Sequence, residues 1–267
     1  MTSLIEPYPL DNHSQHSPMH HQGLAAMLDV FTLRRISYQV QLTGAKVLEV
    51  GAGAGSMAYQ MATMAGPEGS VTALDLKPGH VEHDQLHWLQ HDLRSAEPIP
   101  GGPYDVIHAR LVLGHLPERE LVLSRLIHAG APGTLILVED WHPVRSHATI
   151  SAPTIEARRL YDRYAQAAGR CFDERGTDST WARRMHCVFL QHGLADVDTD
   201  IHGTYWTGGS SEAKHAIGVA QQLRDEVQSH GLTGQDVDEV LELLANPELV
   251  VHSHLLYSTL GYIPPAD

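Results

Sequence analysis

The spacing of hydrophobic and polar positions changes twice along this chain. Between residues 23 and 41 the apolar positions recur mostly every three or four residues, which predicts a helix. From residue 46 to residue 141, short apolar runs alternate with longer segments of helical spacing. After residue 141 this alternation ends. We therefore expect an N-terminal helix, a central region of alternating strands and helices, and a C-terminal region without this alternation.

The central region predicts a parallel sheet. Strands are expected wherever a short apolar run is bounded by turn residues. Their ranges are 47–50, 70–76, 86–90, 104–108 and 134–139. Helices are expected between them at 56–65 and 117–130, the second with a proline and acids in its first turn. Strands and helices that alternate in this way form parallel sheets with helices on both faces.

The remainder predicts helices and two longer strands. The helices are expected at 152–169, at 179–192 and within 210–245, with a break near Gly231. The strands are expected at 196–206 and 249–260. About half of the chain therefore has the pattern of a cofactor scaffold, and the rest that of a cover and a substrate pocket.

Composition narrows the class of protein. With 267 residues, 42% hydrophobic and 19% charged, the chain is globular and forms one large or two small domains. No apolar run approaches the ~20 residues that a membrane span needs, and the first residues lack the order of a signal peptide. The two cysteines, Cys171 and Cys187, are too few for a disulfide scaffold. We expect a cytoplasmic protein without a membrane partner; its oligomeric state is not predictable.

The charge balance disfavours nucleic acid as a partner. Lys and Arg number 18 against 32 Asp and Glu, so the formal net charge is −14. A groove that follows phosphates needs a basic surface, and no basic block offsets this acidity. We expect a small-molecule partner and no nucleic acid.

A glycine-rich turn follows the first predicted strand. The sequence Val-Leu-Glu-Val-Gly-Ala-Gly-Ala-Gly at 47–55 lets a ligand approach the backbone at the start of a helix. Dinucleotide sites use a similar turn, but their third glycine would fall on Ser56. Glu49 would also be unfavourable beside a pyrophosphate. Its carboxylate suits a ligand that carries an ammonium group.

Two more acids follow the next strands. Asp75 ends the second strand and is placed to accept hydrogen bonds from two ribose hydroxyls. Asp92 follows the third strand and is placed to accept one from an adenine amine. A ligand with an adenine, a ribose, an amino-acid end and no phosphate fits this series of acids.

These motifs resemble those of the class I S-adenosylmethionine-dependent methyltransferases. The resemblance is to the small-molecule branch, similar to quinone-biosynthesis and natural-product methyltransferases, and covers about residues 23–142. Besides the glycine-rich turn it rests on Thr-Ala-Leu-Asp-Leu at 72–76, His-Asp-Leu at 91–93, Tyr-Asp-Val-Ile-His-Ala-Arg-Leu-Val-Leu-Gly-His-Leu-Pro at 104–117, and Pro-Gly-Thr-Leu-Ile-Leu-Val-Glu-Asp at 132–140. Thr134 departs from the family's usual Pro-Gly-Gly.

The resemblance implies S-adenosylmethionine as cofactor and a role for each motif. The glycine turn would line the methionine end, Asp75 the ribose, and Leu76 the adenine. The backbone near Ala109 and Arg110 would receive the amino group. The implied cofactor residues are Glu49, Gly51, Ala52, Gly53, Gly55, Asp75, Leu76, Asp92, Leu93, Ala109 and Arg110.

The implied fold is a doubly wound, Rossmann-like α/β domain. Its seven-stranded sheet would be mostly parallel, with segment 249–260 as an antiparallel edge strand, and a helical cap would accompany it. Residues 1–44 would form an N-terminal helical lid. Residues 45–267 would form the methyltransferase domain, with helical insertions at about 146–178 and 208–246.

Two residues are candidates for proton transfer. His115 follows the fourth strand and Asp140 ends the fifth, and ligands bind outside the carboxyl ends of the strands in open α/β sheets. A histidine accepts a proton near neutral pH, and a carboxylate can orient it. Alternatively, His115 caps the next helix or packs on the cofactor, and Asp140 is a structural acid.

Aromatic residues are candidates for the acceptor pocket. We expect contacts from Tyr8, Trp141, Tyr164 and Trp206. For each of the last three taken singly, a place in the core is the favoured interpretation, but at least one of the aromatic residues is expected to touch the substrate. A second cluster, His80, His83, His87 and His91, would share a face of one helix and could then hold zinc. Solvated histidines are the better interpretation, so no metal is expected.

The predicted function is methyl transfer from S-adenosylmethionine to O, N or C of a small molecule, such as a secondary metabolite. Two alternatives stay open at this point. One is a nicotinamide-dependent oxidoreductase of the same topology, and the other is a cofactor-binding protein without methyl transfer.

Overall fold

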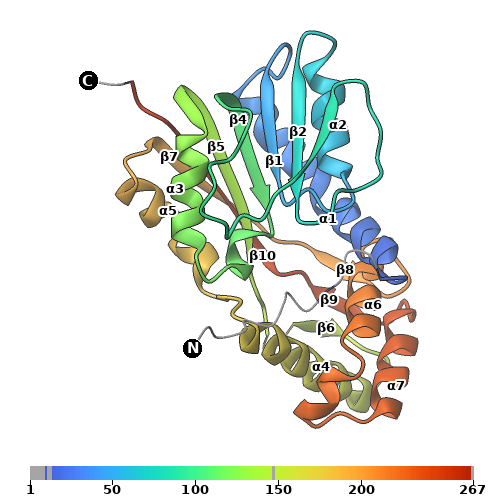
Figure 1. Cartoon of the computed structure of the whole chain (residues 1–267). Helices are drawn as coiled ribbons and strands as arrows, with labels where there is room; N and C mark the ends of the chain where they lie inside the picture. Colours follow the sequence, from blue (N-terminus) through green and yellow to red (C-terminus); the bar gives the residue numbers. More distant parts are fainter. Residues whose placement is uncertain (1–9, 11–13, 146–147, 266–267) are drawn as a thin grey trace. The chain divides into compact units, whose positions relative to one another are not determined.

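A computed structural model describes residues 10, 14–145 and 148–265 (Figure 1). The chain divides into two compact units, each assembled from separate stretches. The sheet unit comprises Asp29–His142, Ser179–His202 and the described part of Leu256–Asp267. The helical unit comprises the described parts of Met1–Leu28 and Pro143–Asp178, together with Gly203–Leu255.

The sheet unit holds seven strands in the order β3-β2-β1-β4-β5-β10-β7. The strands are β1 (Lys46–Val50), β2 (Ser70–Asp75), β3 (Leu86–Gln90), β4 (Tyr104–Arg110), β5 (Gly130–His142), β7 (Ala195–His202) and β10 (Leu255–Tyr262). Strands β1 to β5 pair in parallel. The predicted α/β fold with a mostly parallel seven-stranded sheet is therefore confirmed.

Two predicted strands were wrong in their extent, because each changes sheet part-way. Segment 249–260 divides into β9 (Val250–His252) and β10, and segment 196–206 into β7 and β8 (Tyr205–Thr207). The breaks face each other: the Ser253 amide donates to the Thr204 carbonyl, and the Thr204 amide to the Ser253 hydroxyl. The edge strand of the large sheet is β7, antiparallel to β10, and not segment 249–260.

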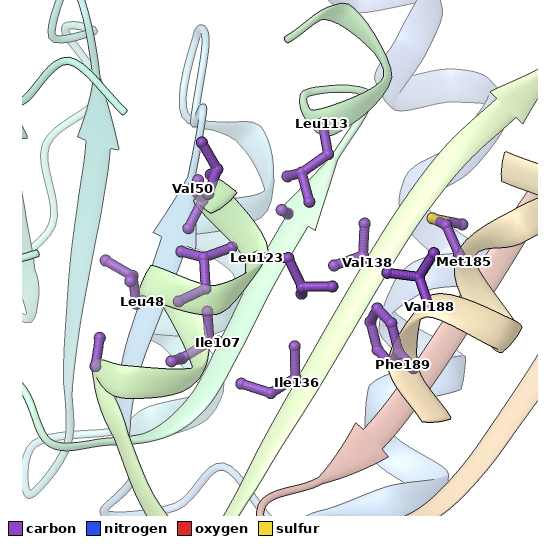
Figure 2. Packing of buried hydrophobic residues seen from close by; sticks show 14 of the residues in the cluster. Leu48, Val50, Ile107, Leu113, Leu123, Ile136, Val138, Met185, Val188 and Phe189 are labelled. Carbon is purple, nitrogen blue, oxygen red and sulfur yellow. The ribbon is translucent and has the colours of Figure 1, made fainter. Parts of the chain in front are cut away.

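Helices of the sheet unit pack on two separate cores, since neighbouring residues of a strand point to opposite faces. One core joins Leu48, Ile107 and Ile136 to helices α3 (Arg119–His128) and α5 (Trp181–Gln191), as Figure 2 shows. The other joins Val47 and Val106 to α2 (Ser56–Ala65) and the second half of α1 (Ser17–Gln39). This is the doubly wound arrangement that the alternation predicts.

The helical unit contains the first half of α1, α4 (Ile155–Glu174), α6 (Ala213–Gln222), the short helix η2 (Glu226–His230) and α7 (Gly234–Leu244). A three-stranded sheet in the order β6-β9-β8 accompanies them, with β6 (Thr149–Ser151) not predicted. The predicted break at Gly231 is present, with φ of 90°. Helix α1 contributes to both units, and the role of residues 1–44 as a lid stays a prediction.

The helices α1 and α4 have 23 and 20 residues. Helix α4 buries one face, including Leu160, Tyr161 and Ala167, and exposes a charged face. Every helix within the described residues is too short or too polar to span a lipid bilayer.

Candidate functional site

The glycine turn that follows β1 has a backbone shape that glycine adopts without strain. Gly51, Gly53 and Gly55 have φ of 64°, 54° and 90°. Side chains would also collide here: a Cβ on Gly51 would lie 2.3 Å from Val112, and one on Gly55 would lie 2.8 Å from Trp88. The turn therefore fixes the chain just before α2, whose first amide groups have no partners within the helix.

Asp75, at the end of β2, is fastened to this turn. Its Oδ2 accepts a hydrogen bond of 2.9 Å from the Gly53 amide, and its Oδ1 accepts one of 3.1 Å from the Lys77 amide. The residue is only 8% exposed, whereas the next one, Leu76, is 51% exposed. Thus a fixed carboxylate and an accessible apolar side chain lie beside each other at the end of β2.

Asp92 already has a partner in its own loop. Its carboxylate makes two hydrogen bonds to the Arg94 guanidinium, of 3.0 and 2.9 Å. Arg94 holds the pKa of Asp92 below its usual value. Leu93 packs partly on the core shared with α3. The predicted contact of Asp92 with an adenine amine would have to share the carboxylate with Arg94, and it stays a prediction.

A buried ion cluster crosses three neighbouring strands. Glu49 of β1 and His108 of β4 are register partners, and Glu49 Oε2 lies 2.5 Å from His108 Nδ1. On the other side, His108 Nε2 lies 3.3 Å from Glu139 Oε2 of β5. Thr32 of α1 donates a hydrogen bond of 2.5 Å to the same Glu139 oxygen. Glu49 is thus one member of a buried charged cluster, and His108 and Glu139 were not predicted from the sequence as site residues.

Carboxylates decide the ionisation of this cluster. Burial by itself lowers the pKa of His108, but Glu49 and Glu139 outweigh it and raise that pKa to about 9. Burial likewise raises the pKa of Glu139, but His108 and Arg110 bring it below the usual value. Ionised groups in a dry interior persist only when they are paired, as these are.

Helix α1 is tied to the same region by Asp29. The Arg110 Nη2 atom donates a hydrogen bond of 2.7 Å to Asp29 Oδ1, and Nη1 one of 3.0 Å to the Thr32 hydroxyl. Asp29 Oδ2 accepts the Ser56 hydroxyl at the start of α2. Ala109 is buried. The predicted backbone role of Ala109 and Arg110 stays a prediction, but the Arg110 side chain has a defined partner.

The sequence held a weak signal for these missed residues. Asp29 and Thr32 are polar, yet they fall next to the apolar positions Leu28 and Phe31 on the buried stripe of α1. A polar residue on an apolar stripe needs a partner. The partners could not be named from the sequence, because they lie on strands far along the chain.

Asp140, on β5, is held beside the segment that carries His115. Its Oδ2 accepts hydrogen bonds of 3.0 Å from the Gly114 amide and of 3.0 Å from Trp181 Nε1. Burial raises the pKa of Asp140 to about 7. Burial and the charge of Arg119 lower the pKa of His115 to about 4. Asp140 thus contacts the residue before His115, and the catalytic roles of both stay predictions.

Of the predicted pocket aromatics, Tyr164 and Trp206 are buried in the helical unit, and Tyr161 lies near both. Its ring centroid is 6.1 Å from that of Tyr164 and 6.3 Å from that of Trp206. The Tyr164 hydroxyl has no hydrogen-bond partner within the described residues. Trp141 is partly buried on β5, and Tyr8 lies outside the described residues. Their contacts with an acceptor stay predictions.

The histidines of the alternative metal site do not share a helix. His87 lies within β3, and His80 and His83 precede that strand in irregular structure. Among the described residues, no group of three or more His, Cys, Asp or Glu side chains could hold a metal ion.

Comparison with known proteins identifies the family. Residues 20–235 match the model of a family described as "Methyltransferase domain". The chain belongs to this family. The matched range includes the glycine turn, Asp75, the buried ion cluster and most of the helical unit. The family assignment does not support the nicotinamide oxidoreductase that the glycine turn left open.

Relatives of this methyltransferase-domain protein match only part of its length. The chain is 39% identical over 97 residues to "Methyltransferase str2" of Strobilurus tenacellus, which is 36% of this chain and 35% of that one. It is 29% identical over 140 residues to the "Ubiquinone biosynthesis O-methyltransferase" of Xylella fastidiosa, 48% of this chain and 52% of that one. The matched part of the chain thus spans about half or less of the length of these curated relatives.

A solved structure shares the fold at low identity. It is phosphoethanolamine N-methyltransferase 2 of Haemonchus contortus in complex with S-adenosyl-L-methionine. The TM-score is 0.54 at 13% identity, and the match covers 95% of this chain and 58% of that one. At this identity the likeness shows that the fold is shared.

Proposed function

We propose that this protein transfers a methyl group from S-adenosylmethionine to an O, N or C atom of a small molecule. The observation that carries the proposal is the Asp75 carboxylate, fastened to the glycine turn by the Gly53 amide at 2.9 Å beside the exposed Leu76. Membership of the methyltransferase-domain family supports it.

The described residues fit each part of this cofactor. A carboxylate has about four lone-pair positions, so Asp75 can accept two ribose hydroxyls besides its two amide donors. Leu76 offers apolar surface to an adenine, with Leu93 and Asp92 as proposed neighbours. Gly51, Ala52, Gly53 and Gly55 would line the methionine end. Glu49 and the backbone of Ala109 and Arg110 would receive its amino group.

When bound, S-adenosylmethionine supplies an electrophilic methyl group on a sulfonium. The task of the chain is to fix the acceptor atom in line with that methyl group and to keep water out. Positioning of this kind contributes up to ~7–11 kcal/mol to lowering a barrier. The hydrogen bonds that join Asp75 to the glycine turn and Glu49 to His108 support this role.

We propose that His115 accepts the proton of a hydroxyl acceptor. Because its pKa is lowered to about 4, the ring is neutral at physiological pH and keeps an acceptor nitrogen. Asp140 would act by holding the Gly114 amide, and so the short helix η1 (Leu113–His115), in place. Proton transfer by a placed base contributes ~10²–10⁴-fold.

The acceptor is proposed to be a small metabolite. The net charge of −14 disfavours polyanions, and a ubiquinone biosynthesis O-methyltransferase among the relatives favours an oxygen acceptor. Trp141, Tyr164, Trp206 and Tyr8 are the proposed contacts. A cytoplasmic location is proposed from cysteine usage, since Cys171 and Cys187 are both free thiols.

Calorimetric titration tests the cofactor assignment. S-adenosylmethionine and S-adenosylhomocysteine should bind saturably, whereas NADH should not. Incubation with labelled S-adenosylmethionine and candidate phenols, amines and quinols, followed by mass spectrometry, should show an acceptor that gains one methylene. Binding of NADH without S-adenosylmethionine would overturn the proposal. Cofactor binding without a product from any acceptor class would reduce the protein to a cofactor-binding domain.

A further inference from the structure

His108 is a buried histidine with a carboxylate at each ring nitrogen. Nδ1 lies 2.5 Å from Glu49 Oε2, and Nε2 lies 3.3 Å from Glu139 Oε2. A neutral imidazole has one N–H, so it would turn a lone pair toward one of the two carboxylates. With both carboxylates ionised, the geometry is satisfied on both sides only when the ring is an imidazolium. The neighbouring carboxylates, which raise the pKa of His108 to about 9, agree with this charge.

The cluster around His108 carries one negative charge in excess. Its carboxylates are Glu49, Glu139 and Asp29, and its cations are Arg110 and the His108 imidazolium. All five side chains are buried, with exposed fractions of 0 to 10%. Uncompensated charge is costly in such a place. One cation from a ligand would balance the cluster.

Glu49 is the member of the cluster that can receive that cation. It lies two residues before the glycine turn, and its hydrogen bond within the described residues goes to His108 through Oε2. Its other oxygen, Oε1, is therefore available. Glu139 Oε1 also has no partner among the described residues, but Glu139 is fully buried and does not adjoin the glycine turn, so it is less suitable.

We propose that His108 is a positioning residue for the amino-acid end of the cofactor: as an imidazolium it holds Glu49 by Oε2, so that Oε1 receives the cofactor's ammonium group. This inference rests on the proposed function. His108 acts through Glu49 and not by contact with the reacting atoms. A histidine that served only to hold the strands together would affect stability but not the recognition of the ammonium group.

Two amide substitutions separate these roles. In His108→Asn the side-chain nitrogen can occupy the place of Nδ1 and still donate to Glu49. In His108→Gln it reaches the place of Nε2 and donates to Glu139 instead. Both remove the charge and both fill most of the ring's space, so they should cost similar stability. They differ in whether Glu49 keeps a donor.

Calorimetric titration with two probes provides the test. S-adenosylhomocysteine carries the ammonium group, and 5′-methylthioadenosine lacks the whole amino-acid end. His108→Gln should weaken the binding of S-adenosylhomocysteine about tenfold to a hundredfold, the range for a hydrogen bond to a charged group. The affinity for 5′-methylthioadenosine should stay unchanged. His108→Asn should recover most of that loss. In a Glu49→Gln background, His108→Gln should cause no further loss. His128→Gln, on the solvent-facing end of α3, is the matched control.

The outcomes are distinguishable. If wild-type protein does not bind S-adenosylhomocysteine, the proposed function fails and the inference with it. If wild type binds it, two results show that His108 is structural: both variants lose affinity equally for the two probes, or neither variant loses affinity for either probe. In both cases only the inference fails. If neither variant folds, ¹⁵N chemical shifts of the histidine rings in wild type decide: the inference requires both His108 nitrogens to be protonated at pH 7, and a neutral ring overturns it.

Discussion

Asp29 of α1 and Arg110 at the end of β4 form an ion pair of 2.7 Å, although 81 residues separate them in sequence. The second Asp29 oxygen accepts the Ser56 hydroxyl, which begins α2 directly after the glycine turn. One carboxylate thus connects α1, β4 and α2. The pair is nearly dry, with side chains 8% and 10% exposed, so removal of one partner leaves the other without its direct ionic contact.

Asp29→Ala should lower the free energy of unfolding, because the Arg110 guanidinium and the Ser56 hydroxyl would both lose the buried carboxylate to which they donate. Loss of one member of a buried pair costs about 3–5 kcal/mol, and the slight exposure of this pair places the expected loss near the lower value. Urea unfolding measures it. Asp238→Ala, which breaks an exposed pair with Arg224, should change little.

Asp75→Ala should weaken S-adenosylmethionine binding about tenfold to a hundredfold, because a hydrogen bond to a charged group is worth ~1.5–3 kcal/mol. Asp105→Ala is the matched control: that carboxylate also accepts a backbone amide, from Lys46, but at the amino-terminal ends of the strands. The affinity of Asp105→Ala for S-adenosylmethionine should equal that of wild type. An unchanged Kd in folded Asp75→Ala would remove Asp75 from the cofactor site.

His115→Ala should lower kcat by about 10²-fold with a hydroxyl acceptor, the lower end of the range for a placed base, because a pKa of about 4 makes His115 a weak base. The Kd for S-adenosylmethionine should stay nearly constant. The pKa of His115 lies at about 4, so this residue does not change its protonation between pH 6 and 8. Its ionisation should therefore not change the kcat of the wild-type protein over this range. Asp140→Asn, whose amide oxygen can still accept from Gly114 and Trp181, should retain most of kcat. Weaker cofactor binding with unchanged kcat in His115→Ala would instead indicate a packing role.

The stability of the protein should fall as the pH rises from 6.5 to 9. The pKa of His108 is raised from 6.5 to about 9, so the folded state binds this proton more tightly than the unfolded state. The stabilisation is complete below pH 6.5 and is lost as the pH passes 9. At ~1.4 kcal/mol per pKa unit, the difference between 6.5 and about 9 amounts to at most about 3.5 kcal/mol. His108→Gln should flatten this part of the profile; an equally steep fall in the variant would assign it to other groups.

Much of the sheet unit was predictable from the sequence, because its elements depend on local pattern. The helix over residues 56–65 and the strand over 86–90 were predicted with their observed bounds. The glycine turn and Asp75 were also found, since strand ends in a parallel sheet meet at one edge whatever the rest of the chain does. Alternation of apolar residues was enough to place these side chains.

Tertiary structure alone decided the partners of the buried charges and the second sheet. Glu49 and His108 are register partners only because β1 and β4 are neighbours. Glu139 reaches His108 only because β5 lies on the other side of β4, where its register partner is Arg110. Asp29 reaches Arg110 only because α1 packs there. The strands that divide at Thr204 and Ser253 do so because those residues bond to each other. Such contacts join residues far apart in the chain, and periodicity within one segment carries no information about them.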